Sequence, residues 1–187
     1  MILPINTYSD PVLGLKAKPL KGVDSTIREL IARMFDTMYK APGIGLAAPQ
    51  VGHSLRLVVV DISSIESYAD LKPMVVINPR ILAMRGRNSM EEGCLSLPGV
   101  AGDVIRPSAI TLHYRDEKFE EHTADFSGMM ARVLQHEIDH LNGTLFIDLM
   151  DKRDRRKIQK DLDAITEGRV QAGYALARDA RRLEAEV

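Results

Sequence analysis

The chain has 187 residues, of which 45% are hydrophobic and 27% are charged, and this size and balance suit one domain with its own core. The net charge of −1 argues against binding to nucleic acid or membranes through an overall field, and the lack of tryptophan argues against a base-stacking platform. The single cysteine, Cys94, excludes an internal disulfide and suits a reducing compartment.

No segment of the sequence resembles a membrane span or a targeting peptide. The apolar runs at 58–60 and 74–77 are only as long as strands. Residues 1–14 lack a basic segment followed by a long apolar run, and they lack the character of a transit peptide. We find no repeat or linker. We therefore expect one domain over 1–187, with a charged helical tail over about 151–187, in a cytoplasmic protein of bacterial type.

Three helices are predicted from apolar residues at helical spacing. The first is capped by Asp24 or Ser25 and ends at 41–43, and its apolar face comprises Ile27, Leu30, Ile31, Met34 and Met38. The second begins near Ser127 and ends at Gly143, with an apolar stripe of Met129, Met130, Val133, Leu134, Ile138 and Leu141. The third lies in the charged tail and has a thin stripe of Ile158, Leu162 and Ile165.

Strands are predicted at 56–62 and 73–79, the second bounded by prolines, and a hairpin is predicted from 108–116 and 118–125. Residues 43–52 combine glycines, small side chains and a proline, which suits a loop or the rim of a sheet. Because these strands follow one another without intervening helices, we expect mainly antiparallel or mixed β-sheets. The predicted class is α+β, with the sheets packed around the second helix and with further helices towards the N- and C-termini.

The second predicted helix carries the sequence His-Glu-Ile-Asp-His at 136–140. Histidines at i and i+4 project from one face of a helix, so His136 and His140 can bind one metal ion. Glu137 follows the first ligand and would flank the ion, where a general base can take a proton from water. Apolar neighbours place these groups near the core, where ionisable side chains are costly unless paired or metal-bound. The motif predicts a metal-dependent hydrolase, and Asp139 receives no role.

A catalytic ion of this kind usually has a third protein ligand. A thermolysin-like peptidase would use a downstream glutamate, for which Glu167 is the nearby candidate, and a metzincin would use a third histidine that this motif lacks. Cys94 is the other candidate, because Gly93 and Pro98-Gly99 indicate a shaped loop over 91–99 that presents the thiol. A thiolate would also cancel one unit of the ion's charge. Cys94 is favoured, but a zinc endopeptidase and a purely structural metal site stay open.

Three motifs, GIGLAAPQ at 43–50, EGCLS at 92–96 and QHEIDH at 135–140, together resemble the three motifs of the peptide deformylase family, in the same order. The resemblance implies an α+β hydrolase that removes the formyl group from the N-terminal formyl-methionine of newly made proteins and releases formate. It also implies one divalent ion, natively iron(II), with zinc, nickel or cobalt as alternatives, held by Cys94, His136 and His140.

The resemblance also implies roles for residues around the ion. Glu137 would act first as a base and then as an acid. The side-chain amide of Gln50 and the backbone N–H of Leu95 would donate hydrogen bonds to the formyl oxygen as charge builds on it. A substrate pocket is expected from the glycine and apolar residues Ile44, Gly45, Met129 and Val133.

Three further interpretations concern other charged groups. Arg106 is expected to hydrogen-bond around the Cys94 loop, and Arg132 to lie at the pocket rim or in solvent. The basic run at 152–160 is either a solvated helix face or a contact with the ribosome, where the expected partners, formyl-methionyl nascent peptides, emerge. Neither a membrane nor DNA is expected as a partner.

Overall fold

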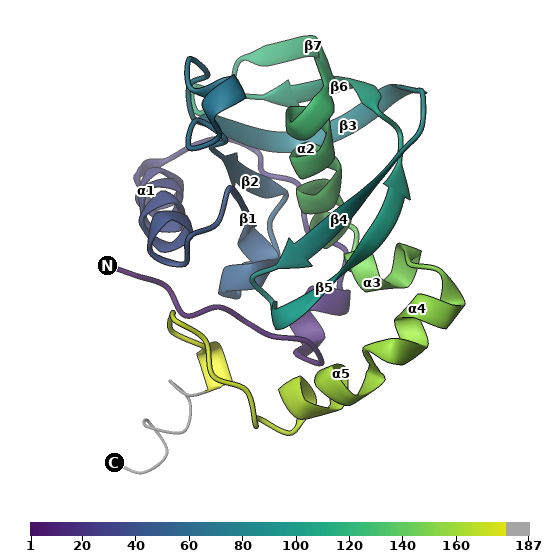
Figure 1. Cartoon of the computed structure of the whole chain (residues 1–187). Coiled ribbons are helices and arrows are strands. Elements are labelled where there is room, and N and C mark those ends of the chain that lie inside the picture. The colour runs from purple at the N-terminus through teal and green to yellow at the C-terminus, as the bar shows by residue number, and fades with distance from the viewer. Residues whose placement is uncertain (179–187) are drawn as a thin grey trace, which may run out of the picture.

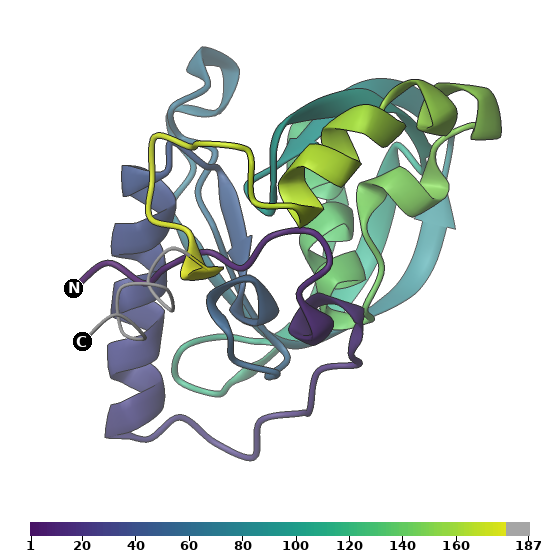
Figure 2. The same cartoon turned by 90° about the horizontal axis from the view of Figure 1, so that it is seen from below.

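The computed structural model describes residues 1–178 (Figures 1 and 2). In chain order the elements, with η for a 3-10 helix, are η1 (Pro11–Gly14), α1 (Ser25–Lys40), β1 (Gly45–Ala47), η2 (Ala48–Val51), β2 (Leu57–Val60), η3 (Glu66–Tyr68), β3 (Met74–Arg85), β4 (Asn88–Cys94), β5 (Leu97–Arg106), β6 (Ala109–Arg115), β7 (Glu121–Ser127), α2 (Gly128–Leu141), α3 (Phe146–Leu149), α4 (Lys152–Lys157) and α5 (Gln159–Thr166). The antiparallel sheets and the helices confirm the predicted α+β class.

Helix α1 forms where predicted, because its sequence supplies both a cap and an apolar face. The Asp24 side chain accepts a hydrogen bond from the Ile27 N–H at 2.9 Å, which satisfies one of the free amides at the start of the helix. The helix ends at Lys40, and its buried apolar residues belong to one core cluster with β1 and β2: Leu30, Ile31, Met34 and Met38.

The larger sheet has five antiparallel strands in the order β1-β2-β3-β6-β7, and the predicted hairpin forms β6 and β7. Strand β3 passes its predicted end at Pro79 and continues to Arg85. Its pairing with β6 shifts register between Ile77 and Arg80, and Asn78 has a φ of 51°. This irregularity lies at the proline, which has no N–H to give to a regular ladder, so the strand continues beyond it.

The second sheet is the β4–β5 hairpin, which corrects the prediction of a loop over 91–99. Cys94 is the last residue of β4 and pairs with Leu97 across a register shift, so the thiol lies at a tight turn between two strands. Strand β4 was not predicted because its residues are mostly polar. The hairpin instead takes its apolar packing from β5 and the C-terminal helices, through Leu97, Val100, Val104, Phe146 and Leu162.

Helix α2 lies between the five-stranded sheet and the β4–β5 hairpin (Figure 1). From Met130 to Leu141 every residue except Asp139 is buried. The apolar side chains of α2 join those of the sheet in one core cluster that includes Val58, Val60, Ile110, Val133, Leu134 and Ile138. The helix therefore carries its two histidines into the space between the two sheets, as the central helix of the prediction.

After α2 the chain covers the far side of the hairpin with α3, α4 and α5 and then returns to the N-terminal segment (Figure 2). Ile5 and Leu176 form a parallel bridge there. Of the predicted helical tail, residues 179–187 lie outside the described residues. Within residues 1–178, none of the helices combines the length and the apolar character that crossing a bilayer requires.

Candidate active site

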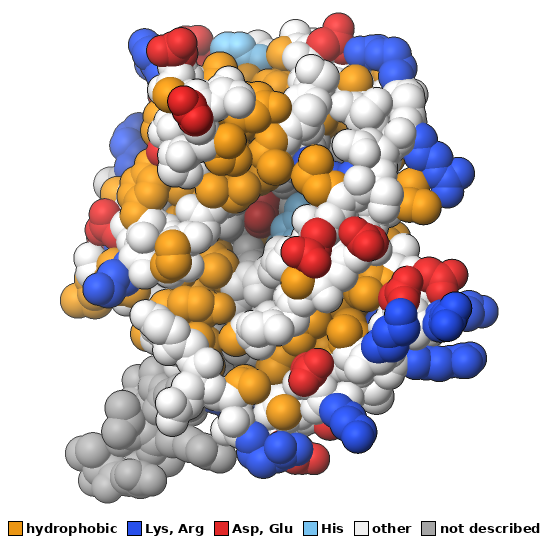
Figure 3. Space-filling model, in the orientation of Figure 1, with side chains coloured by type: hydrophobic (Ala, Val, Ile, Leu, Met, Phe, Trp, Pro, Cys, Tyr) orange, Lys and Arg blue, Asp and Glu red, His pale blue; other side chains and the backbone are white. Residues whose placement is uncertain are grey.

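A cavity of about 420 Å³ opens between α2, the β4–β5 hairpin and the segment around β1. Figure 3 shows this hollow, with a histidine and an acidic side chain at its floor. The structure brings all four residues expected in the substrate pocket to its wall: Ile44, Gly45, Met129 and Val133. The same cavity is lined by five residues expected in the chemistry: Gln50, Cys94, Leu95, His136 and Glu137.

Three possible metal ligands meet beside this cavity. Cys94 comes from the end of β4, and His136 and His140 come from successive turns of α2. The Cys94 Sγ lies 3.2 Å from His140 Nε2, and one ligand atom of each residue lies within 4.8 Å of the others. The alternative third ligand, Glu167, follows α5 and pairs with Arg169 at the surface, so it does not reach the histidines.

Glu92 fixes the orientation of His136. Its Oε2 accepts a hydrogen bond from His136 Nδ1 at 2.8 Å, which leaves Nε2 of that ring free to face the sulfur. Glu92 precedes Cys94 by two positions on β4, and both side chains contact histidines of α2. One strand therefore supplies both the thiol and the carboxylate that orients a histidine.

Two buried arginines hold Glu92 in place. Arg106 from β5 donates to both carboxylate oxygens, at 2.6 and 3.0 Å, and Arg132 from α2 donates to Oε1 at 2.7 Å. Arg132 is 5% exposed, so it is not a solvated side chain. Arg106 also binds Asp139 at 2.6 Å, which gives a structural partner to a residue that the motif left without a role. This network ties α2 to the hairpin.

The local electrostatics act in opposite directions on the two histidines. Burial raises the pKa of Glu92, but hydrogen bonds to His136 and Arg106 outweigh it and bring the pKa to about 2, so the carboxylate stays charged. Burial lowers the pKa of His136, but hydrogen bonds to Cys94 and Glu92 hold it well above its usual range. Burial and the neighbouring His136 hold the pKa of His140 well below its usual range. His140 therefore offers a free lone pair, and His136 would release a proton when a metal binds.

The donor set also fits a divalent ion. One thiol and two imidazoles are ligands that zinc and iron(II) accept, and three protein ligands leave a place for water or substrate. His140 Nδ1 is buried, and no group in the described part of the chain hydrogen-bonds to it. The three side chains thus match the ligands expected from the sequence in identity and in proximity.

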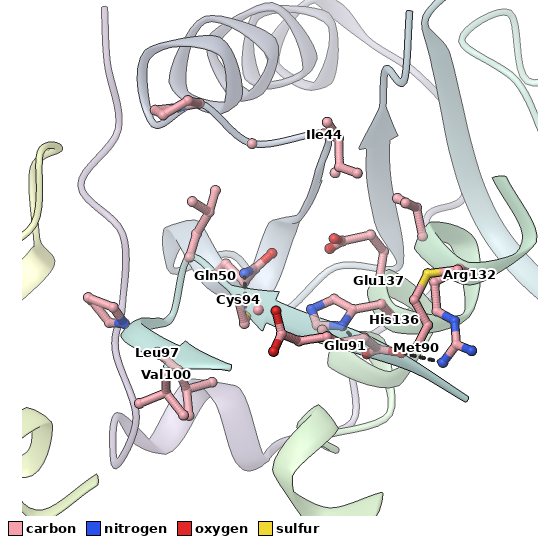
Figure 4. A pocket seen from close by; sticks show the side chains of 18 of the residues that line it. Ile44, Gln50, Met90, Glu91, Cys94, Leu97, Val100, Arg132, His136 and Glu137 are labelled. Carbon is pink, nitrogen blue, oxygen red and sulfur yellow. Dashed lines mark hydrogen bonds and ion pairs between the residues drawn. The ribbon is translucent and has the colours of Figure 1, made fainter. Parts of the chain in front are cut away.

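Glu137 lies in the cavity as a buried carboxylic acid. Its side chain is within the cavity wall near His136 and Ile44 (Figure 4). Burial raises its pKa to about 7, which is the range in which one group can both accept and return a proton. Within residues 1–178, its Oε2 has no hydrogen-bond partner. Gly45 lies so close that a Cβ there would be 2.6 Å from Glu137 Oε1.

Gln50 is buried next to Cys94, and its amide is fixed in one orientation (Figure 4). Its Oε1 accepts a hydrogen bond from the Ala47 N–H at 2.8 Å. The Nε2 group therefore points away from Ala47, towards Ser96 Oγ at 3.3 Å and Cys94 Sγ at 3.5 Å. Leu95 follows Cys94 in the turn of the hairpin and lines the cavity. The two expected donors to a formyl oxygen thus flank the same sulfur.

Three neighbours of the site were not found from the sequence. Glu92 belongs to the EGCLS motif, and its place two residues before Cys94 on a strand was the available signal. Ser96 is fully buried and faces Gln50. Tyr174 lines the cavity from a segment 80 residues away from Cys94 along the chain, and nothing local to Tyr174 indicates that it returns there.

Comparison with known proteins agrees with this site. The family model described as polypeptide deformylase matches residues 2–156. The peptide deformylase of Chlorobaculum tepidum is 84% identical over 186 residues and that of Chlorobaculum parvum is 78% identical over 186 residues, each match covering 100% of both chains.

Solved structures agree as well. A crystal structure of a peptide deformylase from Legionella pneumophila has a TM-score of 0.82 at 39% identity, covering 90% of this chain and 98% of that one. A plant peptide deformylase has a TM-score of 0.84 at 37% identity, covering 89% and 90%. The chain therefore belongs to the polypeptide deformylase family, the hydrolases that remove the formyl group from the N-terminal methionine of newly made proteins.

Proposed function

We propose that Cys94, His136 and His140 hold the divalent ion on which this family depends, and that Glu137 is the general base and acid of formyl removal. The observation that carries the proposal is a buried carboxyl group that is adjacent in sequence to one of three clustered metal-ligand candidates and faces the same cavity. Iron(II) is proposed as the native ion, and zinc, nickel or cobalt would also suit the donor set.

A bound divalent ion supplies a Lewis acid that lets water react near neutral pH. Glu137 takes a proton from the attacking water and later gives it to the departing amine. The Gln50 side-chain amide and the Leu95 backbone N–H donate to the formyl oxygen as negative charge builds on it. The products are formate and a peptide with a free amino terminus.

The substrate's methionine side chain is proposed to lie among the apolar residues of the cavity. Ile44, Met129 and Val133 are suited to a thioether chain, because Met is flexible and fills irregular apolar space. Gly45 has no side chain, so a peptide backbone can approach β1 closely and add to its edge.

The decisive experiment replaces Glu137 with Ala and measures formate from formyl-Met-Ala-Ser under anaerobic conditions, with elemental analysis of the same sample. We expect the metal content to stay the same while kcat falls by a factor of about 10² to 10⁴, the usual contribution of a general acid–base group. Glu29→Ala, at an exposed position of α1, is the control and should retain full activity. Substantial formate release by the Glu137 variant would contradict the proposed role.

The same measurement on Cys94→Ala distinguishes the proposal from a zinc endopeptidase. The proposal predicts loss of both metal and activity, because one of three ligands is gone. A variant that keeps its metal and cleaves within peptide chains would favour a carboxylate as the third ligand. Elemental analysis of protein purified without air identifies the native ion.

We also propose that the chain is a single catalytic domain and that it works in the cytoplasm.

A further proposal is that the basic run at 152–160 contacts the ribosome. Lysine and arginine side chains gather over α4 (Figure 3). Arg153, Arg156 and Lys160 are exposed, so changing all three to Glu tests ribosome binding without disturbing the core. Affinity should fall, whereas reversing three exposed lysines elsewhere, at Lys16, Lys18 and Lys21, should not lower it equally. Unchanged affinity would exclude this contact.

A further inference from the structure

The segment that follows α5 runs back beside the N-terminal segment (Figure 2). The family model matches this chain only to residue 156, yet Tyr174 is one of the residues that line the cavity. The part of the chain outside the family match therefore contributes a side chain to the site.

The N-terminal segment fixes the position of the segment that carries Tyr174. The Ile5 N–H donates to the Ala175 carbonyl at 2.8 Å, and the Ala177 N–H donates to the Ile5 carbonyl at 2.9 Å. Leu176, between these two, is 2% exposed. Tyr174 therefore immediately precedes a paired and buried stretch of backbone, which limits how far its side chain can move.

The Tyr174 hydroxyl reaches the turn that carries Leu95. It donates a hydrogen bond to the Leu95 carbonyl at 2.8 Å, and both side chains pack at the edge of the same core cluster. Burial and the nearby Cys94 raise the pKa of Tyr174 to about 12, so the hydroxyl keeps its proton and remains a donor at neutral pH.

The same N-terminal segment holds the other side of this turn. The Tyr8 N–H donates to the Ser96 carbonyl at 2.9 Å, and the Asn6 N–H donates to the Gln50 carbonyl at 2.7 Å. The N-terminal segment and the segment of Tyr174 beside it thus contact the backbone near both proposed oxyanion donors. Leu95 itself receives its hydrogen bond from the tyrosine.

We infer that Tyr174 is a positioning residue of this hydrolase: by holding the Leu95 carbonyl, it keeps the Leu95 N–H directed at the formyl oxygen. The inference rests on the proposed role of Leu95. A donor that is already oriented needs no rearrangement when charge develops on the substrate, so its effect appears in the transition state. Loss of the orientation should therefore lower kcat and leave KM nearly unchanged.

Tyr174→Phe tests this, because it removes the hydroxyl and keeps the ring. With formyl-Met-Ala-Ser we expect kcat to fall about tenfold and KM to stay within about twofold, with a thermal midpoint within about 4 °C of the wild type. In ¹⁵N-labelled protein, hydrogen exchange at the Leu95 amide should become several times faster. Tyr114→Phe, which alters a half-buried tyrosine on β6 that does not line the cavity, should change none of these quantities.

An unchanged kcat in Tyr174→Phe would overturn the inference, and so would a rise in KM in place of the fall in kcat. A lower thermal midpoint with full kcat would show that the hydroxyl only stabilises the fold and would also overturn it. Failure of the wild-type protein to release formate would contradict the proposed function instead. In that case the exchange rate at Leu95 would still decide whether Tyr174 holds this amide.

Discussion

Glu137 is buried, and burial disfavours the charged form of its carboxyl group. Burial raises its pKa from 4.5 to about 7. In the metal-free protein the unfolded chain gives up this proton near pH 4.5, whereas the folded chain keeps it until about pH 7. Folding therefore becomes less favourable as pH rises between these values, and the loss levels off above pH 7. The burial of this carboxyl group therefore lowers the stability of the metal-free fold at neutral pH.

Glu137→Gln should therefore stabilise the metal-free protein at high pH. The two pKa values differ by an amount that corresponds to about 3 kcal/mol, so the free energy of unfolding at pH 8 should rise by up to that much. The difference should disappear at pH 4, where both states hold the proton. Urea unfolding at the two pH values measures this, with Glu29→Gln as an exposed control. Equal stabilities at pH 8 would mean that burial does not raise this pKa.

The candidate ligands could be proposed from the sequence because their chemistry is local. His136, Glu137 and His140 lie within five residues of one helix, and Cys94 is the only cysteine. Glu92 could not be assigned in the same way, because its role depends on contacts with Arg106, Arg132 and His136 from two other elements. A carboxylate on a polar strand looks the same in sequence whether it is solvated or paired.

At the level of elements, helices were predicted better than strands. Both α1 and α2 show apolar residues at helical spacing and clear end signals, and these depend only on neighbours along the chain. Strand β4 has no apolar alternation, and β3 continues past Pro79 through a register shift. Whether a polar or proline-containing stretch becomes a strand depends on its partner, which a local pattern does not contain.

Strand β1 and helix α2 approach each other closely at Gly45. This close approach should determine where the Glu137 carboxyl group, the proposed base, can lie. A Cβ at Gly45 would lie 2.6 Å from Glu137 Oε1 and 2.8 Å from Val133 Cγ1. Gly45→Ala should displace the carboxylate and lower kcat/KM for formyl-Met-Ala-Ser by about 10²-fold, the usual result of misplacing a catalytic group. The metal content should not change, because no ligand is touched.

Gly22→Ala provides the matched control for this substitution. A Cβ at Gly22 would meet nothing within 4 Å, so the variant should behave like the wild type in both stability and activity. Full activity in Gly45→Ala would contradict this prediction. It would show that catalysis does not depend on the exact position of the Glu137 carboxylate.

In the molecule as a whole, the site joins two parts that have separate cores. Helix α2 belongs to the cluster of the five-stranded sheet, whereas the β4–β5 hairpin packs with α3 and α5. The two parts meet through the Glu92 network and through the cluster of Cys94, His136 and His140. The resemblance to three family motifs indicated that the segments of Cys94 and of the two histidines meet. The spacing of hydrophobic residues could not indicate this, because it reports only on neighbours along the chain.

A metal ion bound by Cys94 and the two histidines would connect these parts, so removing it should destabilise the whole chain. A ligand at a thousand times its Kd stabilises the folded state by about 4 kcal/mol, which corresponds to a fall in the thermal midpoint of roughly 8 to 16 °C on chelation for a domain of this size. Calorimetry with and without a chelator measures the fall.

Cys94→Ala should abolish most of the fall in thermal midpoint on chelation, because it removes the one proposed metal ligand that the hairpin supplies. His122→Ala should preserve it, although His122 lies in another group of possible ligands, with Asp116 and Glu120. If chelation leaves the midpoint of the wild-type protein unchanged, the ion does not connect α2 to the hairpin. Direct contacts must then hold the two parts together, among them the Glu92 network and the hydrogen bonds from Arg132 to the Val104 and Asn88 carbonyls. If His122→Ala removes the effect instead, the stabilising ion lies on the β6–β7 turn, away from the cavity.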